Sequence, residues 1–259
     1  MTVVVTGGNR GIGYAVCERL ARAGKRVVLV SRDRERGAAA IRALPGEVDL
    51  VVGDLTTFAG VRILAEELRR ICPRIEVLVH NAGLWPSRRV LTADGVEESF
   101  AINHLAPFLL NHLLEDLLGR VVQVSAGLYA KGKVNPDRTP QGLDFHPIRT
   151  YADTKLCNVL MLPLFARRWE DAGVTIDAVH PGVIRTGLGD RGGPAGLLLK
   201  AAKRFWLPPE KGAEPVVRLA LENTGTGRFF NVNKEIPIEL DEDLARRVWT
   251  QAAELTGAG

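Results

Sequence analysis

Residues 3–13 read Val3-Val4-Val5-Thr6-Gly7-Gly8-Asn9-Arg10-Gly11-Ile12-Gly13 and combine three signals. The β-branched run predicts a buried strand, the glycines predict a sharp turn, and the following residues predict the start of a helix. Glycines let a backbone approach a pyrophosphate, whose charge suits the N–H groups at a helix start. The sequence therefore predicts a dinucleotide site whose members are Gly7, Asn9, Arg10, Gly11, Ile12 and Gly13. The alternative is a tight connection that binds nothing, because the spacing T-G-x-x-x-G-x-G differs from G-x-G-x-x-G.

Short apolar runs alternate with longer amphipathic segments along the rest of the chain. Strands are predicted at residues 3–6, 27–31, 48–52, 77–80, 121–125 and 174–179. Helices are predicted at residues 11–23, 34–43, 57–71, 102–118, 149–171, 210–222 and 241–256. Because each strand is almost wholly apolar, helices should cover both faces of a parallel sheet. We predict an α/β fold: a doubly wound parallel sheet of Rossmann type, with ligands at the carboxyl ends of the strands.

Length and composition limit the classes of protein to which this chain can belong. No linker divides the 259 residues, so we interpret residues 1–259 as one domain. The net charge of +4 comes from scattered arginines, which argues against nucleic-acid binding. No apolar run approaches the roughly 20 residues that span a bilayer, and no signal segment precedes the first strand, so we expect a cytoplasmic protein without a transmembrane segment. The cysteines and histidines lack metal-site spacings, so no metal is expected.

Tyr151 and Lys155 lie four residues apart in the predicted helix 149–171, hence on one face. A free phenol has a pKa of about 10, and a nearby ammonium favours the phenolate, which would make Tyr151 a better acid or base near neutrality. Taken alone, this spacing also fits a surface tyrosine beside a solvated lysine.

Several motifs in the same order resemble those of the short-chain dehydrogenase/reductase family, and the likeness covers essentially the whole chain. They are the glycine turn, Asp54-Leu55, Asn81-Ala82-Gly83, Asn103, the serine-bearing end of the fifth strand, Tyr151-x-x-x-Lys155 and His180-Pro181-Gly182-Val183-Ile184-Arg185-Thr186. Residues 103–108 and 241–249 are similar to the retinol-dehydrogenase-like branch. The resemblance implies that Asp54 and Leu55 contact adenine and that Pro181, Gly182, Val183 and Thr186 line the nicotinamide.

The resemblance also implies an activity, which is hydride transfer between a nicotinamide ring and the carbonyl or alcohol carbon of a small, apolar molecule. In reduction Tyr151 would protonate the forming alkoxide. Lys155 would hold the nicotinamide ribose and keep the tyrosine acidic, and Asn103 would position a water that links the lysine to solvent. Asn81, Ala82 and Gly83 would shape the cofactor floor, although a purely structural role for Asn81 is open.

The family's catalytic serine falls at an unusual place in this sequence. The family usually ends its fifth strand with two small polar residues, of which the second is catalytic, but here the second place holds Ala126. Ser125 is one residue early. Because successive side chains of a strand point to opposite faces, Ser125 can replace the missing hydroxyl only if the alternation breaks there. The alternative is that Ser125 only caps the strand.

The second strand ends in Ser31-Arg32, which indicates NADP as the cofactor. An acidic residue at this place would favour NAD, whereas the Arg32 and Arg10 guanidiniums suit the 2′-phosphate of NADP. Asp33 could reverse this preference if the register shifted by one residue.

Three further expectations concern the surroundings of the site. Residues 186–209 are interpreted as a substrate-covering segment, with an ordinary surface helix or a membrane-contacting segment as alternatives. A homodimer or homotetramer is expected, in which Leu160, Met161, Leu162 and Phe165 pack against a symmetry mate or instead fill the core. The alternative functions are an NADP-binding regulatory or scaffold protein with weak or lost catalysis and, ranked last, a sugar-nucleotide epimerase or dehydratase.

Overall fold

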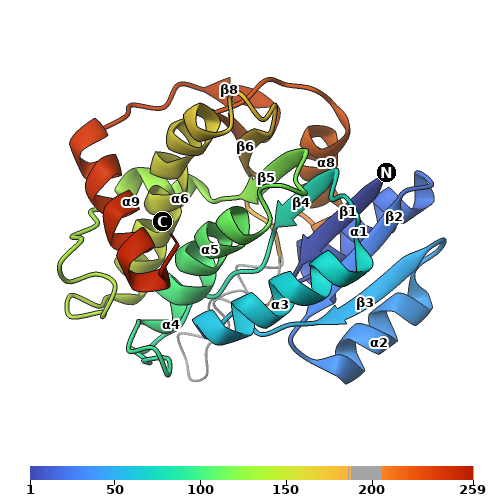
Figure 1. Cartoon of the computed structure of the whole chain (residues 1–259), viewed down its shortest axis with the longest axis horizontal. Helices are drawn as coiled ribbons and strands as arrows, with labels where there is room; N and C mark the ends of the chain where they lie inside the picture. The colour runs from blue at the N-terminus through green and yellow to red at the C-terminus, as the bar shows by residue number, and fades with distance from the viewer. Residues whose placement is uncertain (186, 188–205, 259) are drawn as a thin grey trace.

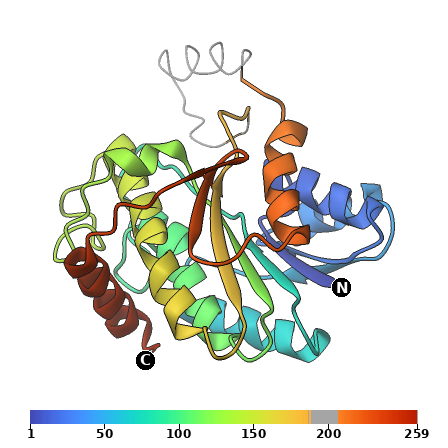
Figure 2. The same cartoon turned by 90° about the horizontal axis from the view of Figure 1, so that it is seen from above.

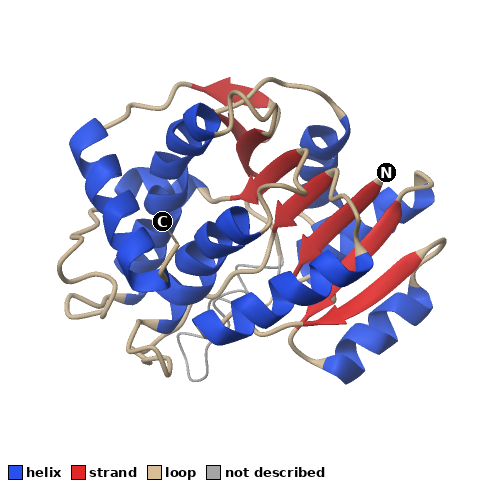
Figure 3. Ribbon diagram, viewed as in Figure 1, coloured by secondary structure: helices blue, strands red, loops and turns tan. Residues whose placement is uncertain are grey.

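An eight-stranded sheet forms the centre of the computed structural model, which describes residues 1–185, 187 and 206–258 (Figures 1 and 3). The strands lie in the order β3-β2-β1-β4-β5-β6-β7-β8, and all neighbours pair in parallel except β7 and β8. Their bounds are β1 (Thr2–Thr6), β2 (Arg26–Ser31), β3 (Val48–Val52), β4 (Val77–His80), β5 (Arg120–Val124), β6 (Thr175–His180), β7 (Arg228–Asn231) and β8 (Lys234–Ile236). The predicted doubly wound α/β class is confirmed.

Helices cover both faces of this sheet, as Figure 2 shows. The helices α1 (Gly11–Arg22), α2 (Arg34–Ala43) and α8 (Pro209–Leu221) contribute to one apolar cluster. The helices α3 (Phe58–Ile71), α5 (Ala106–Leu113), α6 (Pro147–Arg168) and α9 (Glu242–Thr256) contribute to the other. The described residues also contain three short elements, which are α4 (Glu98–Phe100), the π turn η1 (Ala101–Leu105) and the 3₁₀ turn η2 (Gly127–Lys131).

Strand alternation divides the apolar residues between the two clusters. In β1 the side chains of Val3 and Val5 join the α1 side, whereas Val4 joins the α3 side. All three are fully buried, because helices close both faces of the sheet. This explains why the central strands are almost wholly apolar.

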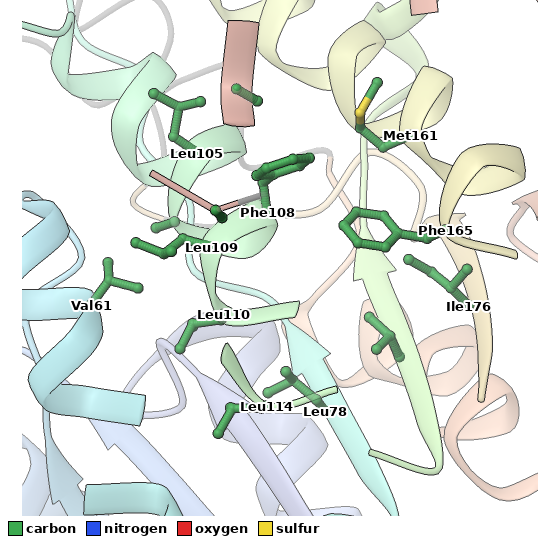
Figure 4. Packing of buried hydrophobic residues seen from close by; sticks show 14 of the residues in the cluster. Val61, Leu78, Leu105, Phe108, Leu109, Leu110, Leu114, Met161, Phe165 and Ile176 are labelled. Atoms are coloured by element: carbon green, nitrogen blue, oxygen red, sulfur yellow. The ribbon is translucent and has the colours of Figure 1, made fainter. Parts of the chain in front are cut away.

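The α5 and α6 helices pack through large aromatic side chains, shown in Figure 4. The ring centroids of Phe108 and Phe165 lie 5.6 Å apart, and Trp249 of α9 lies 4.7 Å from Phe165. Leu160, Met161, Leu162 and Phe165 are all buried within the chain. These four side chains of α6 therefore fill the core, which was one of the two expectations for them.

The β7–β8 hairpin contains a strained residue, Val232, which is the one non-glycine residue with positive φ among those the structure describes (φ 56°). A β-branched side chain is unfavourable in this conformation by roughly 1–2 kcal/mol, whereas glycine adopts it freely. We expect Val232→Gly to raise the free energy of unfolding by about 1 kcal/mol in a urea titration. Val232→Ala is the control, because alanine keeps a Cβ. Equal stability of the two variants would contradict the strain.

Candidate active site

The glycine turn after β1 takes its shape from close backbone contacts. Gly7 and Gly11 have φ values of 65° and 57°, which favour glycine. A Cβ on Gly13 would lie only 2.3 Å from Nδ2 of Asn81 and 2.5 Å from the carbonyl of Gly7. The Asn81 amide donates to the carbonyls of Thr6 and Gly7 at 2.9 and 3.2 Å. Asn81 therefore fastens the turn to the end of the neighbouring strand β4.

A cavity of about 440 Å³ lies along the carboxyl ends of the strands, within the range of small-molecule and cofactor sites. The predicted residues that line it are Gly7, Asn9, Arg10, Gly11, Ile12, Gly13, Ser31, Arg32, Asp54, Leu55, Asn81, Ala82, Gly83, Ser125, Tyr151, Lys155, Pro181 and Gly182. The structure thus brings one end of every strand from β1 to β6 to one cavity. Asn103 is not among the lining residues, and it lies behind the loop that follows β4.

One end of the cavity is basic. Arg10 and Arg32 line it and make no ion pair with the described residues, and Arg36 of α2 lies beside them. Asp33, the residue that could reverse the cofactor preference, is occupied: it caps α2 by accepting from the backbone N–H of Arg36 at 3.0 Å, and it pairs with the Arg36 guanidinium at 3.3 Å. The Asp33 carboxylate thus serves as the N-cap of α2.

The other end of the cavity holds the buried pair Tyr151 and Lys155 on α6. The Lys155 ammonium donates to the carbonyl of Val124 at 3.1 Å and lies 5.6 Å from the centroid of the Tyr151 ring. The indole of Trp85 stacks on that ring at 5.0 Å and is anchored by its N–H to the carbonyl of Pro147 at 2.8 Å. The stacked indole therefore holds the Tyr151 ring in place, and the hydrogen bond to Val124 holds the Lys155 ammonium.

The pKa values of this pair differ from the sequence expectation. Burial raises the pKa of Tyr151 well above its usual value of 10, and burial lowers the pKa of Lys155 from 10.5 to about 8. Burial therefore dominates the pKa of the phenol in the protein alone, and the expected acidifying effect of Lys155 stays a prediction. The reason is that burial disfavours phenolate and ammonium alike, while the ammonium faces a backbone carbonyl instead of the phenol oxygen.

The end of β5 shows how Ser125 and Ala126 lie. The strand stops at Val124, so the alternation expected to continue through residue 125 ends one residue earlier. Both residues line the cavity, but the Ser125 hydroxyl oxygen itself is covered and has no hydrogen-bond partner among the described residues. The role of Ser125 as a donor stays a prediction.

Asn103 lies in η1, where the predicted helix 102–118 is interrupted. The structure replaces that helix by α4, the π turn and α5, which ends at Leu113. The side-chain oxygen of Asn103 accepts from the backbone N–H of Leu84 at 2.7 Å. Its amide donates to the carbonyl of Leu84 at 2.9 Å and to the hydroxyl of Thr154 at 3.1 Å. Asn103 thus ties the loop after β4 to α6, beside Lys155.

One predicted residue, Val183, does not line the cavity, and another, Thr186, is not described by the structure. Val183 is 55% exposed and is absent from the cavity lining. Thr186 lies outside the described residues, as do residues 188–205 of the expected substrate-covering segment.

Sequence reasoning missed several lining residues, among them Arg36, Thr56 and Ile102, whereas His180 and Ile184 belong to the motif expected to line the nicotinamide. Two of the missed positions offered a signal: Thr56 follows the predicted contact residues Asp54 and Leu55, and Arg36 lies four residues after Arg32. Among the described residues no group of three His, Cys, Asp or Glu side chains is placed to bind a metal. Within the same part of the chain, every helix is too short or too polar to cross a membrane.

The family follows from comparison with known proteins. The model described as short chain dehydrogenase matches residues 1–192. The chain belongs to the short-chain dehydrogenase family and is an oxidoreductase of that family.

Individual relatives show where in the family the chain finds similar proteins. The chain is 34% identical to retinol dehydrogenase 14 of Homo sapiens over 290 residues, covering 99% of this chain and 86% of that protein. A crystal structure of an uncharacterized protein from Mycobacterium Paratuberculosis matches with a TM-score of 0.81 and 28% identity, covering 99% of this chain and 93% of the other. A blue fluorescent protein from a metagenomic library, solved in complex with NADPH, matches at 25% identity and a TM-score of 0.72, covering 90% and 96%. The resemblance to the retinol-dehydrogenase-like branch is thus confirmed.

Proposed function

We propose that the protein transfers a hydride between NADP(H) and the carbonyl or alcohol carbon of an apolar small molecule, with residues 1–259 acting as one catalytic domain. The buried Tyr151 and Lys155 pair at the end of the nucleotide-sized cavity carries this proposal. Retinol in the name of the 34%-identical relative supports an apolar substrate.

The nicotinamide supplies or accepts the hydride when it is bound. Tyr151 acts as the proton donor in reduction, and its raised pKa keeps the phenol protonated at neutral pH, which is the form that reduction needs. Lys155, Asn81 and the glycine turn hold the nucleotide. The loop of Pro181 and Gly182 closes the nicotinamide end of the cavity.

NADP is the proposed cofactor because Arg10 and Arg32 line the cavity without an ion pair to a described residue, while the carboxylate of Asp33 caps α2 and pairs with Arg36. Arginine binds phosphate through charge-assisted, often bidentate hydrogen bonds. The NADPH in the metagenomic structure is consistent with this choice.

Replacing Arg32 tests the cofactor proposal. Loss of one charge-assisted contact costs about 1.5–3 kcal/mol, so Arg32→Ala should weaken NADPH binding about 10- to 100-fold and leave NADH binding unchanged. Calorimetric titration of both nucleotides measures the effect. Arg34→Ala is the matched control, because Arg34 is exposed and does not line the cavity. An equal loss for NADPH and NADH would contradict a 2′-phosphate contact.

Turnover of a panel of apolar aldehydes and ketones with NADPH tests the reaction itself. Oxidation of NADPH above the level of Tyr151→Phe is the expected result. The second candidate, an NADP-binding regulatory or scaffold protein, is favoured by Ala126 and by the covered hydroxyl of Ser125. It requires tight NADPH binding together with no substrate consumption above the Tyr151→Phe level.

Assembly and location stay predictions. A homodimer or homotetramer would need a surface other than the four buried side chains of α6, and light scattering after size-exclusion chromatography measures its mass. A cytoplasmic location is likewise still an expectation, which fractionation of cells that express the protein tests.

A further inference from the structure

Pro107 cannot supply the α-helical donor for one backbone carbonyl of the π turn. In an α-helix the carbonyl of Asn103 would accept from the N–H of residue 107, but that residue is Pro107, which has none. The backbone N–H of Ala106 reaches instead to the carbonyl of Ala101, five residues back, which is the π-type bond. The Asn103 carbonyl receives a side-chain donor in compensation: Nδ2 of Asn158 on α6, at 2.8 Å.

Asn158 is itself held by His104. Its side-chain oxygen lies 3.0 Å from Nδ1 of His104, and both residues are at least 95% buried. Burial lowers the pKa of His104 to about 4, so the ring is neutral near pH 7. Because Asn158 presents its oxygen, the His104 proton must sit on Nδ1 and leave Nε2 as an acceptor. Nε2 has no partner among the described residues, and His104 lines a small cavity of about 10 Å³, room for about one water.

This network reaches the Tyr151 and Lys155 pair through Asn103. Thr154, which accepts from the Asn103 amide, directly precedes Lys155. A Cβ on Gly83 would lie 3.6 Å from the Asn103 side-chain oxygen and 3.9 Å from the Lys155 ammonium, so the two groups share one wall of the site. A shift of the π turn therefore displaces the surroundings of the ammonium.

We propose that Asn158 and His104 are positioning residues that lock the π turn, so that Asn103 holds Thr154 and the Lys155 side chain in their catalytic places. The inference rests on the proposed oxidoreductase function, because only then does the place of Lys155 set a rate. It also gives Asn103 a structural role in addition to the positioning of a water that the family resemblance implies.

The chain contains a matched control for this proposal. Asn111 on α5 makes a similar buried bond, from its side-chain oxygen to Nε2 of His80 at 2.8 Å, and it lines the same small cavity. Within the described chain, the side chain of Asn111 makes no hydrogen bond to η1 or to α6. Asn111→Leu and Asn158→Leu therefore remove the same chemistry at the same depth, but only Asn158→Leu releases the Asn103 carbonyl.

The test compares kcat and the pH profile of kcat/KM for the two variants. Misplacement of a catalytic group by about 1 Å costs up to about 100-fold, so Asn158→Leu should lower kcat about 10- to 100-fold per folded molecule. It should also move the alkaline limb of the profile upward, because water then reaches Lys155 and favours its charged form. Asn111→Leu should lower the melting temperature to a similar extent and leave kcat and the pH profile unchanged.

A second readout does not depend on turnover. Titration of ¹³C-labelled lysine by NMR, with Lys155→Met to assign the signal, follows the pKa of Lys155 in each variant. The proposal expects an upward shift in Asn158→Leu and none in Asn111→Leu, even if no substrate is found for the protein. If Asn158→Leu does not fold, Asn158→Ala removes the same donor to Asn103 without adding a charge or apolar bulk, and it should give the same shift when compared with Asn111→Ala. Equal behaviour of the Asn158 and Asn111 variants in both readouts overturns the proposal.

Discussion

Ala126→Ser is expected to raise kcat for carbonyl reduction by about 100- to 1000-fold, because one hydrogen-bond donor to a developing oxyanion contributes that much. Ala126 lines the cavity with Tyr151, and its backbone is extended, with φ −148° and ψ 147°, so a serine side chain fits without backbone strain. The covered hydroxyl of Ser125 leaves the donor position open. Steady-state kinetics with NADPH and an apolar ketone measure the gain.

Ser125→Ala separates the two serine positions. If Ala126→Ser brings no gain while Ser125→Ala lowers kcat by the same factor, then Ser125 turns toward the substrate and is the donor. Ala126→Val is the control for side-chain size, since it adds bulk without a hydroxyl. A gain in Ala126→Val equal to that in Ala126→Ser would exclude hydrogen bonding as the cause.

Lys155→Met is expected to abolish most activity and to stabilise the fold at the same time. General acid–base assistance contributes about 10²- to 10⁴-fold, and loss of the ammonium should cost a large part of it, together with nucleotide affinity. The stability gain arises because the wild-type protein buries an ammonium whose hydrogen-bond acceptor among the described residues is the carbonyl of Val124. Lowering the Lys155 pKa from 10.5 to about 8 corresponds to a cost of about 3 kcal/mol.

The pH dependence of this gain has a definite sign. Below pH 8 the folded wild type carries the charged, buried lysine and the whole cost is present. Between about pH 8 and 10.5 the folded protein releases this proton while the unfolded chain retains it, so wild-type stability rises with pH. Urea titrations should therefore show Lys155→Met more stable than the wild type by up to about 3 kcal/mol at pH 7 and by less at pH 9.5.

Tyr151 is present in both the wild type and Lys155→Met. Its titration therefore does not contribute to the difference between their free energies of unfolding. Lys155→Arg serves as the control, since a guanidinium stays charged throughout this range. A stability difference between Lys155→Met and the wild type that does not change with pH would exclude titration of the lysine as its source.

The sequence predicted the central fold well, because buried parallel strands are continuous apolar runs. The predicted strands at residues 48–52 and 77–80 have the bounds of β3 and β4. The missed strands β7 and β8 are short, and the residues of β8 are Lys234, Glu235 and Ile236, which carry no apolar run. The π turn was missed because the apolar periodicity of this helix does not reveal it; Pro107, which follows the turn, was the one local signal.

The candidate site was likewise predicted in part from the sequence. Residues at strand ends could be predicted, because parallel strands bring their carboxyl ends to one edge. The raised pKa of Tyr151 could not be predicted, because it depends on burial of the ring, and Trp85, which packs on that ring, belongs to a distant part of the sequence. The capping role of Asp33 could not be predicted either, because an aspartate that caps a helix and one that binds a ribose look the same in a sequence.

The bond from Asn81 to the glycine turn has a consequence for folding. The turn follows β1, but the residue that fastens it comes from β4, and the two strands pair across a long stretch of chain. Such distant pairings form slowly because loop closure precedes any gain from contact. Nucleotide affinity can therefore arise only after the middle of the sheet has assembled. A nascent or truncated chain that ends before β4 has the whole glycine motif and still lacks a receptor for the coenzyme.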